Sequence, residues 1–180
     1  GAWFLRNSNS GGAGDVVFTY GAGGITQRPI KGDYNNDGID TAGIYDQTSG
    51  AFFLRNANSS GPANIVFTFG PAATNWIPLC GDWNNDGFDT IGLYEPVSGT
   101  FFLKNSNTAG AADITFSFGA GGATMLVGDW NLDGRDTIGI YIPASGSWFL
   151  RNTNASGAAD VVFGYGPAGA TPLTGDWDAL

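Results

Sequence analysis

Histidine is absent from the 180 residues and cysteine occurs once. Without histidine the chain lacks the usual general base and the commonest ligand of transition metals. The lone Cys80 cannot form an internal disulfide, and Val127 and Thr174 stand at its position in two of the repeats described below. We therefore interpret Cys80 as a small, buried strand residue.

Basic residues are also scarce, with seven Lys and Arg against 16 Asp and Glu and a net charge of −9. Nucleic acids and anionic membranes require a cationic surface, so both are excluded as expected partners. No initiator methionine is present, and we expect neither a signal peptide nor a transmembrane stretch within these 180 residues. We expect a mature product, or a piece of a longer protein, that does not insert into membranes.

The composition favours a folded all-β chain. Apolar residues make up 42% and aromatic residues 14% of the sequence, which is too hydrophobic for a disordered chain. Thirty glycines interrupt it, and no stretch has a long helical period. Short strands joined by many turns are predicted.

Internal repetition is the strongest signal in the sequence. "GDYNNDGIDTAGIY" begins at Gly32, "GDWNNDGFDTIGLY" at Gly81 and "GDWNLDGRDTIGIY" at Gly128, and a truncated "GDWDAL" begins at Gly175. Motifs of the type "FFLRN" and "DVVFTYG" follow in each unit. We interpret 1–180 as one repeat domain with units of about 32–80, 81–127 and 128–174, and a partial unit from 1–31 and 175–180.

Each unit is predicted to contain four strands, which in the second unit are 77–82, 90–95, 99–105 and 113–119. In the last of these Ile114, Phe116 and Phe118 share one face, with Thr115 and Ser117 on the other. The third strand has apolar residues on both faces, which indicates a sheet covered on both sides. Repeated four-stranded antiparallel blades favour a β-propeller, and near-identical repeats argue against the alternative of a β-sandwich.

The two ends of the chain hold split remnants of a fourth unit. Seventeen residues lie between Trp130 and Trp148, but only five connect Trp177 through the C-terminus to Trp3, which is about a dozen fewer. The remnants could form a defective fourth blade, or pair with another copy or another neighbour, because unpaired strand edges seek partners. We expect residues 171–177 to form an inner strand near the hairpin 2–20, within one molecule or across two.

The acidic loop of each unit predicts a cation site. Asp82, Asn84 and Asp86 are spaced two apart, Gly87 allows a sharp bend, and the Phe88 carbonyl can add a backbone oxygen. Such an all-oxygen set suits Ca²⁺ better than Mg²⁺, which demands a strict octahedron. The loop is not an EF-hand, since its twelfth position holds Ile44, Leu93 or Ile140 instead of glutamate.

The motif "GDWNNDGFDTIGLY", recurring between two short strands, resembles the FG-GAP/VCBS repeats of integrin-α-like propellers. The resemblance covers nearly the whole chain and implies a loop that binds Ca²⁺ between the first two strands of each blade. About three ions are then expected. The implied ligands are Asp33, Asn35, Asp37 and the Ile39 carbonyl; Asp82, Asn84, Asp86 and the Phe88 carbonyl; and Asp129, Asn131, Asp133 and the Arg135 carbonyl.

The closing ligand of each set is left open by the sequence. The family usually places an aspartate where this chain has Thr41, Thr90 and Thr137, and the aspartates Asp40, Asp89 and Asp136 lie one residue earlier. The truncated copy offers Asp176 and Asp178, and we expect that site to be empty or weak. The alternative for all these loops is a solvated turn without metal, because Asp, Asn and Gly are ordinary turn formers.

Few residues remain outside the acidic loops to form an active site or a second kind of binding site. Nine of the 16 acids lie in the three full loops, and Asp15, Asp113 and Asp160 are expected to pair across a hairpin with Arg6, Lys104 and Arg151. Few carboxylates remain for a hydrolase, so we expect no enzyme and no catalytic residues. The aromatic residues beside the first loop aspartate, Tyr34, Trp83, Trp130 and Trp177, are interpreted as packing between blades, with sugar stacking as the alternative.

The sequence thus predicts a non-enzymatic, calcium-stabilised propeller module of an extracellular or cell-surface protein. The family resemblance implies adhesion or the binding of a protein or glycan ligand. The rivals are a carbohydrate-binding lectin and the accessory domain of a secreted hydrolase. Self-association through the terminal strands is a further expectation.

Overall fold

The computed structural model describes residues 1–119 and 122–175, and this part of the chain contains strands and turns but no helix. It therefore contains no helix long and apolar enough to cross a membrane. The 14 strands form four antiparallel sheets. The predicted all-β class is confirmed for these residues.

The sheets, here named A to D, follow one another along the chain. Sheet A contains β1 (Ala2–Leu5) and β2 (Val16–Thr19); sheet B contains β3 (Gln27–Gly32), β4 (Thr41–Asp46), β5 (Ala51–Leu54) and β6 (Ile65–Thr68); sheet C contains β7 (Ile77–Gly81), β8 (Thr90–Glu95), β9 (Thr100–Leu103) and β10 (Ile114–Ser117); sheet D contains β11 (Thr124–Gly128), β12 (Thr137–Ile142), β13 (Ser147–Leu150) and β14 (Val161–Gly164). Within each sheet, neighbours in sequence are neighbours in space.

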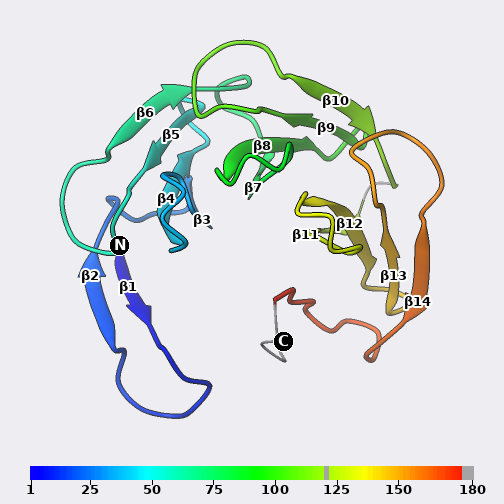
Figure 1. Cartoon of the computed structure of the whole chain (residues 1–180), viewed down its shortest axis with the longest axis horizontal. Helices are drawn as coiled ribbons and strands as arrows, with labels where there is room; N and C mark the ends of the chain where they lie inside the picture. Colours follow the sequence, from blue (N-terminus) through cyan, green and yellow to red (C-terminus); the bar gives the residue numbers. More distant parts are fainter. Residues whose placement is uncertain (120–121, 176–180) are drawn as a thin grey trace.

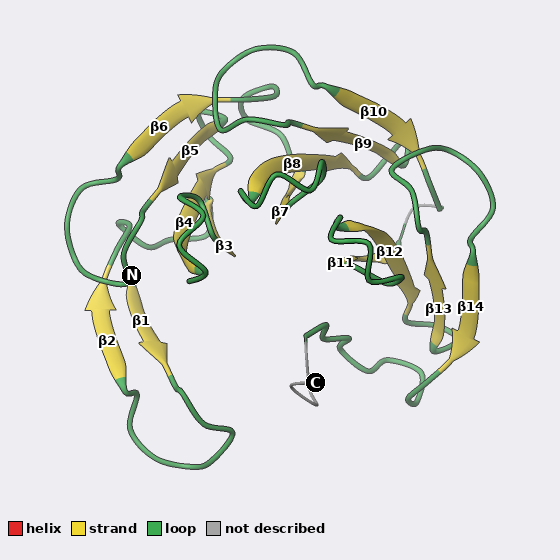
Figure 2. Cartoon of the chain, in the orientation of Figure 1, coloured by secondary structure: helices red, strands yellow, loops and turns green. Residues whose placement is uncertain are grey.

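The four sheets are arranged in an open arc (Figure 1). The first strand of each four-stranded sheet lies nearest the centre, where β7 contacts both β3 and β11, and the last strand lies at the rim. Figure 2 shows long loops joining the two outer strands of each sheet. The arc stays open between the hairpin β1–β2 and sheet D.

The second strand of each full sheet is buried along nearly its whole length because both of its faces are covered. In β4, β8 and β12 five of the six residues are buried. Such strands do not alternate between apolar and polar residues, as an antiparallel strand with one wet face would. Alternation appears in the outer strand β10, where Phe116 is buried and Ser117 exposed.

The core lies between the sheets and is repeated at each junction. Phe18 and Tyr20 of the first repeat pack with Ala42 and Ile44 of sheet B. At the next junction, Tyr45, Phe52 and Leu54 of sheet B pack on Ile91 and Leu93 of sheet C. At the third, Tyr94, Phe101 and Leu103 of sheet C pack on Ile138 and Ile140 of sheet D. Each repeat is therefore stabilised mainly by its neighbours, as in other repeat proteins.

The predicted strands of the second unit agree with the structure to within two residues at each end. The expectation for the C-terminal segment is wrong within the single chain. Residues 171–175 form no strand, and Thr174 Oγ1 donates to the Val127 carbonyl of sheet D at 3.2 Å. Figure 1 shows this segment across the gap from β1–β2. An inner strand needs a hydrogen-bonded neighbour, and the hairpin supplies only the two outer strands of a unit; residues 176 and 177 lie outside the described part.

Truncation of a core aromatic should test the dependence of each sheet on its neighbour. Phe101 is fully buried between sheets C and D. We expect Phe101→Ala to lower the free energy of unfolding by about 3–5 kcal/mol, because the lost burial and the cavity add. Ile25→Ala, at a side chain that is 98% exposed, should change it by less than about 0.5 kcal/mol. Denaturant unfolding of both variants measures the difference, and equal costs would contradict the assignment of Phe101 to the core.

Candidate metal-binding loops

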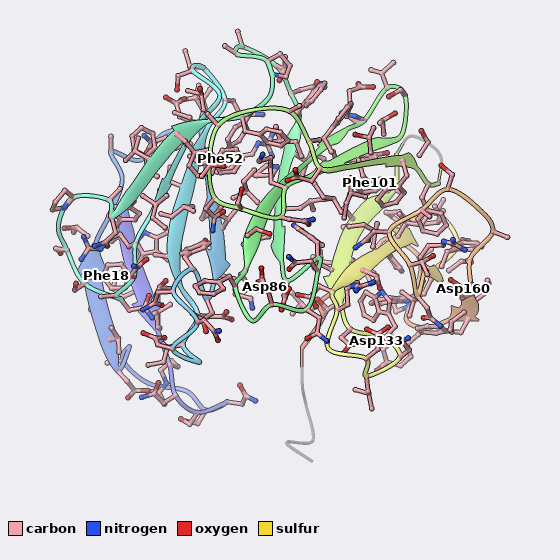
Figure 3. All side chains as sticks on the ribbon, turned by 45° about the horizontal axis from the view of Figure 1, so that its top comes forward. Phe18, Phe52, Asp86, Phe101, Asp133 and Asp160 are labelled. Carbon is pink, nitrogen blue, oxygen red and sulfur yellow. The ribbon has the colours of Figure 1, made fainter. Side chains whose placement is uncertain are left out.

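Each acidic loop connects the first strand of a sheet to the second. The loops are 33–40 between β3 and β4, 82–89 between β7 and β8, and 129–136 between β11 and β12. Figure 3 shows Asp86 and Asp133 on neighbouring loops at one end of the molecule. The three predicted ligand sets therefore lie at equivalent places on consecutive sheets.

The first aspartate of each loop organises the backbone around its carboxylate. Asp33 Oδ1 accepts from the amides of Asn35 at 3.3 Å and Asp37 at 3.2 Å, and its Oδ2 accepts from the amide of Gly38 at 2.7 Å. Asp82 makes the same three bonds in the second loop. In the third loop Asp129 accepts from Asp133 at 3.1 Å and from Gly134 at 2.7 Å. The loop is thus wrapped around this carboxylate.

The second and third predicted ligands are brought to the same turn. Asn35 Nδ2 donates to Asp37 Oδ2 at 2.9 Å, and Asp37 Oδ1 accepts from the Ile39 amide at 3.0 Å. The Asn84–Asp86 and Asn131–Asp133 pairs repeat the side-chain contact at 2.9 and 3.0 Å. The Asp–Asn–Asp part of each predicted set is therefore gathered within one turn.

Two amide oxygens in these turns have no hydrogen-bond partner. Asn35 Oδ1 and Asn84 Oδ1 are buried atoms without a donor in the part of the chain that the structure describes. A buried carbonyl oxygen normally has a partner, since leaving it unpaired costs about 1–3 kcal/mol. Both orphaned oxygens lie at the position that supplies the amide ligand in the predicted cation set.

Backbone conformation and close packing explain the residue types in the loops. Asn36, Asn85 and Leu132 adopt positive φ angles of 57°, 61° and 61°. Gly87 has φ of 87°, and a Cβ there would lie 2.6 Å from Asn36 Nδ2 of the neighbouring loop. Only glycine satisfies both constraints. Adjacent loops are therefore in contact, and Asn85 Nδ2 donates to the Asp133 carbonyl at 3.1 Å.

The last aspartates of the second and third loops bind the preceding sheet. Asp89 Oδ2 accepts from the Asp33 amide at 2.9 Å, and the Asp89 amide donates to the Asp33 carbonyl at 2.8 Å. Asp136 makes the same pair of bonds to Asp82, at 3.0 and 2.8 Å. Asp40 instead accepts from Lys31 at the surface. One carboxylate oxygen of Asp89 and of Asp136 is thus engaged with the preceding loop, and one of Asp40 with Lys31.

The threonines that follow are fixed inside the sheets. Thr41, Thr90 and Thr137 are buried. Their hydroxyls donate to the carbonyls of Arg55, Lys104 and Arg151, at 2.6, 2.7 and 2.6 Å respectively. The threonine hydroxyl therefore joins the second strand to the end of the third, directly below the acidic loop.

Three asparagines outside the acidic loops support them. Asn58, Asn107 and Asn154, in the long hairpin loops, each donate from Nδ2 to the carbonyl of the last loop aspartate, at 2.9 Å in every case. The constant separation of 18 residues between donor and acceptor was the available signal. Each hairpin loop thus braces the acidic loop of its own sheet.

Burial at the junction of the sheets alters the acidity of the bridging aspartates. Burial raises the pKa of Asp89 to about 6, opposed by the hydrogen bond from the Asp33 amide. The carboxylates of Asp136 and Asp40 raise that pKa further. Burial is also the main reason that the pKa of Asp136 is raised. Negative charge is therefore costly at this junction, mainly because the carboxylates are removed from water.

The donor set of each loop fits a hard cation that keeps part of its water shell. Among residues 1–119 and 122–175, no three His, Cys, Asp or Glu side chains lie together as a metal site. Each loop instead offers two carboxylates and one amide oxygen, followed by the carbonyl of Ile39, Phe88 or Arg135. An all-oxygen set of this kind suits Ca²⁺, with water completing the shell. Asp176 and Asp178 lie outside the described residues.

The remaining candidate residues are engaged in packing and in ion pairs. Tyr34 and Trp83 are 3% and 1% exposed between the sheets, while Trp130 is partly exposed and Trp177 lies outside the described part. The predicted hairpin ion pairs are present, with N–O distances of 3.9 Å for Arg6–Asp15, 3.5 Å for Lys104–Asp113 and 3.3 Å for Arg151–Asp160.

Substitution of a bridging aspartate should test its role between the sheets. In the presence of a chelator, we expect Asp89→Ala to lower the free energy of unfolding by about 1–3 kcal/mol, because the Asp33 amide loses its acceptor. Asp89→Asn keeps an acceptor oxygen and should cost less. The matched control is Asp40→Ala, whose surface ion pair is worth at most about 1 kcal/mol. Equal costs for Asp89→Ala and Asp40→Ala in denaturant unfolding would refute the bridging role.

Comparison with known proteins adds no relative to these observations. No protein-family model, curated protein or solved structure matches the chain. The arrangement of the loops therefore rests on the residues and contacts described above.

Proposed function

We propose that the chain is a non-enzymatic, calcium-stabilised β-propeller module of an extracellular or cell-surface protein, serving adhesion or ligand binding. The propeller is supported by the radial order of strands in sheets B, C and D, with first strands at the centre and last strands at the rim. It is further supported by the repeated face-to-face cores between consecutive sheets. Sheet A then contributes the outer half of one more blade.

Calcium binding is supported above all by the unpaired oxygens of Asn35 and Asn84. Each lies in a turn with two carboxylates, at the same place in two consecutive repeats. A cation in the turn would give these oxygens a partner and would offset the repulsion between the carboxylates. A turn that holds neither a metal ion nor a bound water at this point leaves both costs in place.

The modest number of carboxylates also favours an extracellular setting. The donor set within each turn has two carboxylates, such as Asp82 and Asp86, and the rest of the set is neutral. Sites with few charged ligands bind Ca²⁺ weakly, and dissociation constants of about 10⁻⁴–10⁻³ M are typical of extracellular modules. Such sites would be filled at the millimolar calcium concentrations outside cells.

A structural role is favoured over catalysis because most acids already have partners. Asp89 and Asp136 bridge sheets, and Asp15, Asp113 and Asp160 pair with basic residues. The lectin alternative loses two of its candidate rings, since Tyr34 and Trp83 are buried. An accessory role beside a secreted hydrolase is compatible with the same module.

Removal of calcium is the test of this proposal. At a hundredfold excess over its dissociation constant, each bound ion stabilises the folded chain by about 2.7 kcal/mol. We expect chelation to lower the melting temperature by many degrees, and Ca²⁺ to restore it better than Mg²⁺. Asp86→Ala should remove one site and part of the shift. Calorimetric melting with and without chelator, together with a count of bound ions, measures both effects.

Glu95→Gln is the matched control for charge. It removes one negative charge from sheet C at a turn that is not part of an acidic loop. It should leave the calcium-dependent shift unchanged. The proposal fails if the wild-type chain melts at the same temperature in chelator and in millimolar Ca²⁺.

A further inference from the structure

One face of sheet D exposes aromatic side chains whose counterparts in the other repeats are buried. Tyr165, just after β14, is 73% exposed, whereas Tyr20, Phe69 and Phe118 at the same repeat position are 7%, 5% and 7% exposed. Phe163 is 41% exposed against 6% for its counterpart Phe116. Among the described residues, this face has no sheet packed against it.

The other repeats show what covers this face. On sheet B it is covered by Ile91, Leu93 and the partly buried Phe102 of sheet C. On sheet C it is covered by Ile138, Ile140 and the partly buried Phe149 of sheet D. In both sheets this phenylalanine is the second of the two aromatic residues in the third strand. At both junctions, therefore, the face of one sheet that corresponds to the exposed face of sheet D packs against the phenylalanine-bearing face of the next sheet.

On sheet A, the phenylalanine-bearing face, which in the other sheets packs on the preceding repeat, is exposed. Phe4 in β1 occupies the position of Phe53, Phe102 and Phe149, each of which packs against the preceding repeat. Phe4 is 69% exposed. Its neighbours Trp3 and Leu5 point the other way and pack on sheet B. The chain thus presents one uncovered face on sheet D and one unused covering face on the hairpin.

These two faces cannot meet within the arc as it stands, because the hairpin and sheet D lie on opposite sides of its gap (Figure 1). On sheet D, segment 170–173 leaves a hollow of about 360 Å³ lined by Tyr141, Trp148 and Tyr165. This hollow is open to an aromatic ring that comes from outside. Exposed apolar patches of this kind mark interaction surfaces.

We propose that sheet D is a docking face for the hairpin β1–β2 of a second copy of this chain, with Phe4 of that copy packing beside Trp148 and Tyr165. The contact joins two different surfaces, so it is head-to-tail and leaves one face of each kind free in the pair. Copies therefore add to one another until a ring closes or a chain of modules forms. This assembly does not depend on calcium in the acidic loops.

Complementary variants test the proposal. Phe4→Asp and Tyr165→Asp each place a charge at an exposed site on one of the two faces, so neither should disturb the fold of a single copy. By light scattering over a concentration series, the wild-type chain should associate, and each variant alone should remain a monomer. An equimolar mixture should form a 1:1 dimer and nothing larger, because one partner keeps each functional face.

Val97→Asp is the control, since this side chain is 88% exposed on the turn between β8 and β9, away from both faces. It should associate as the wild type does. The proposal is overturned if the wild-type chain is monomeric at all concentrations, or if either single variant still associates. A monomer whose melting temperature falls with Phe4→Asp would show that the hairpin closes on its own sheet D instead.

Discussion

The apolar contact between consecutive sheets is the interaction on which the rest of this structure depends. Among the described residues, sheets B and C are each covered on one face by the preceding repeat and on the other by the next, so their buried strands depend on their neighbours. That requirement explains why the second strands are buried over five of their six residues and why large aromatic rings recur at fixed places. It also sets the spacing at which the acidic loops meet.

The acidic loops use this spacing to join neighbouring repeats by polar contacts. A carboxylate from one repeat and a backbone amide from the preceding one meet at Asp89 and Asp33, and again at Asp136 and Asp82. The hairpin asparagines and the buried threonines fix each loop to the sheet below it. The gathered oxygens of each turn are therefore held by three sets of contacts, which is the kind of preorganisation that a cation site needs.

The ends of the arc follow from the same contact. A repeat protein always leaves one face uncovered at its last unit and one unused at its first, unless the units close on themselves. Here the two faces differ in kind, with Tyr165 and Phe163 on one and Phe4 on the other. An assembly between copies would continue the packing rule that already operates three times within the chain.

The sequence alone determined the repeat, the strand order within each unit and the residues that gather in each loop. These follow from local patterns, since the alternation, the glycine bends and the Asp–Asn–Asp spacing each act within a few residues. Tertiary structure decided the rest. Asp40, Asp89 and Asp136 share one motif, yet two bridge sheets and one pairs with Lys31, because only the former have a preceding loop beside them. The path of residues 171–175 and the openness of the arc likewise depend on which partners are present in space, which no local pattern encodes.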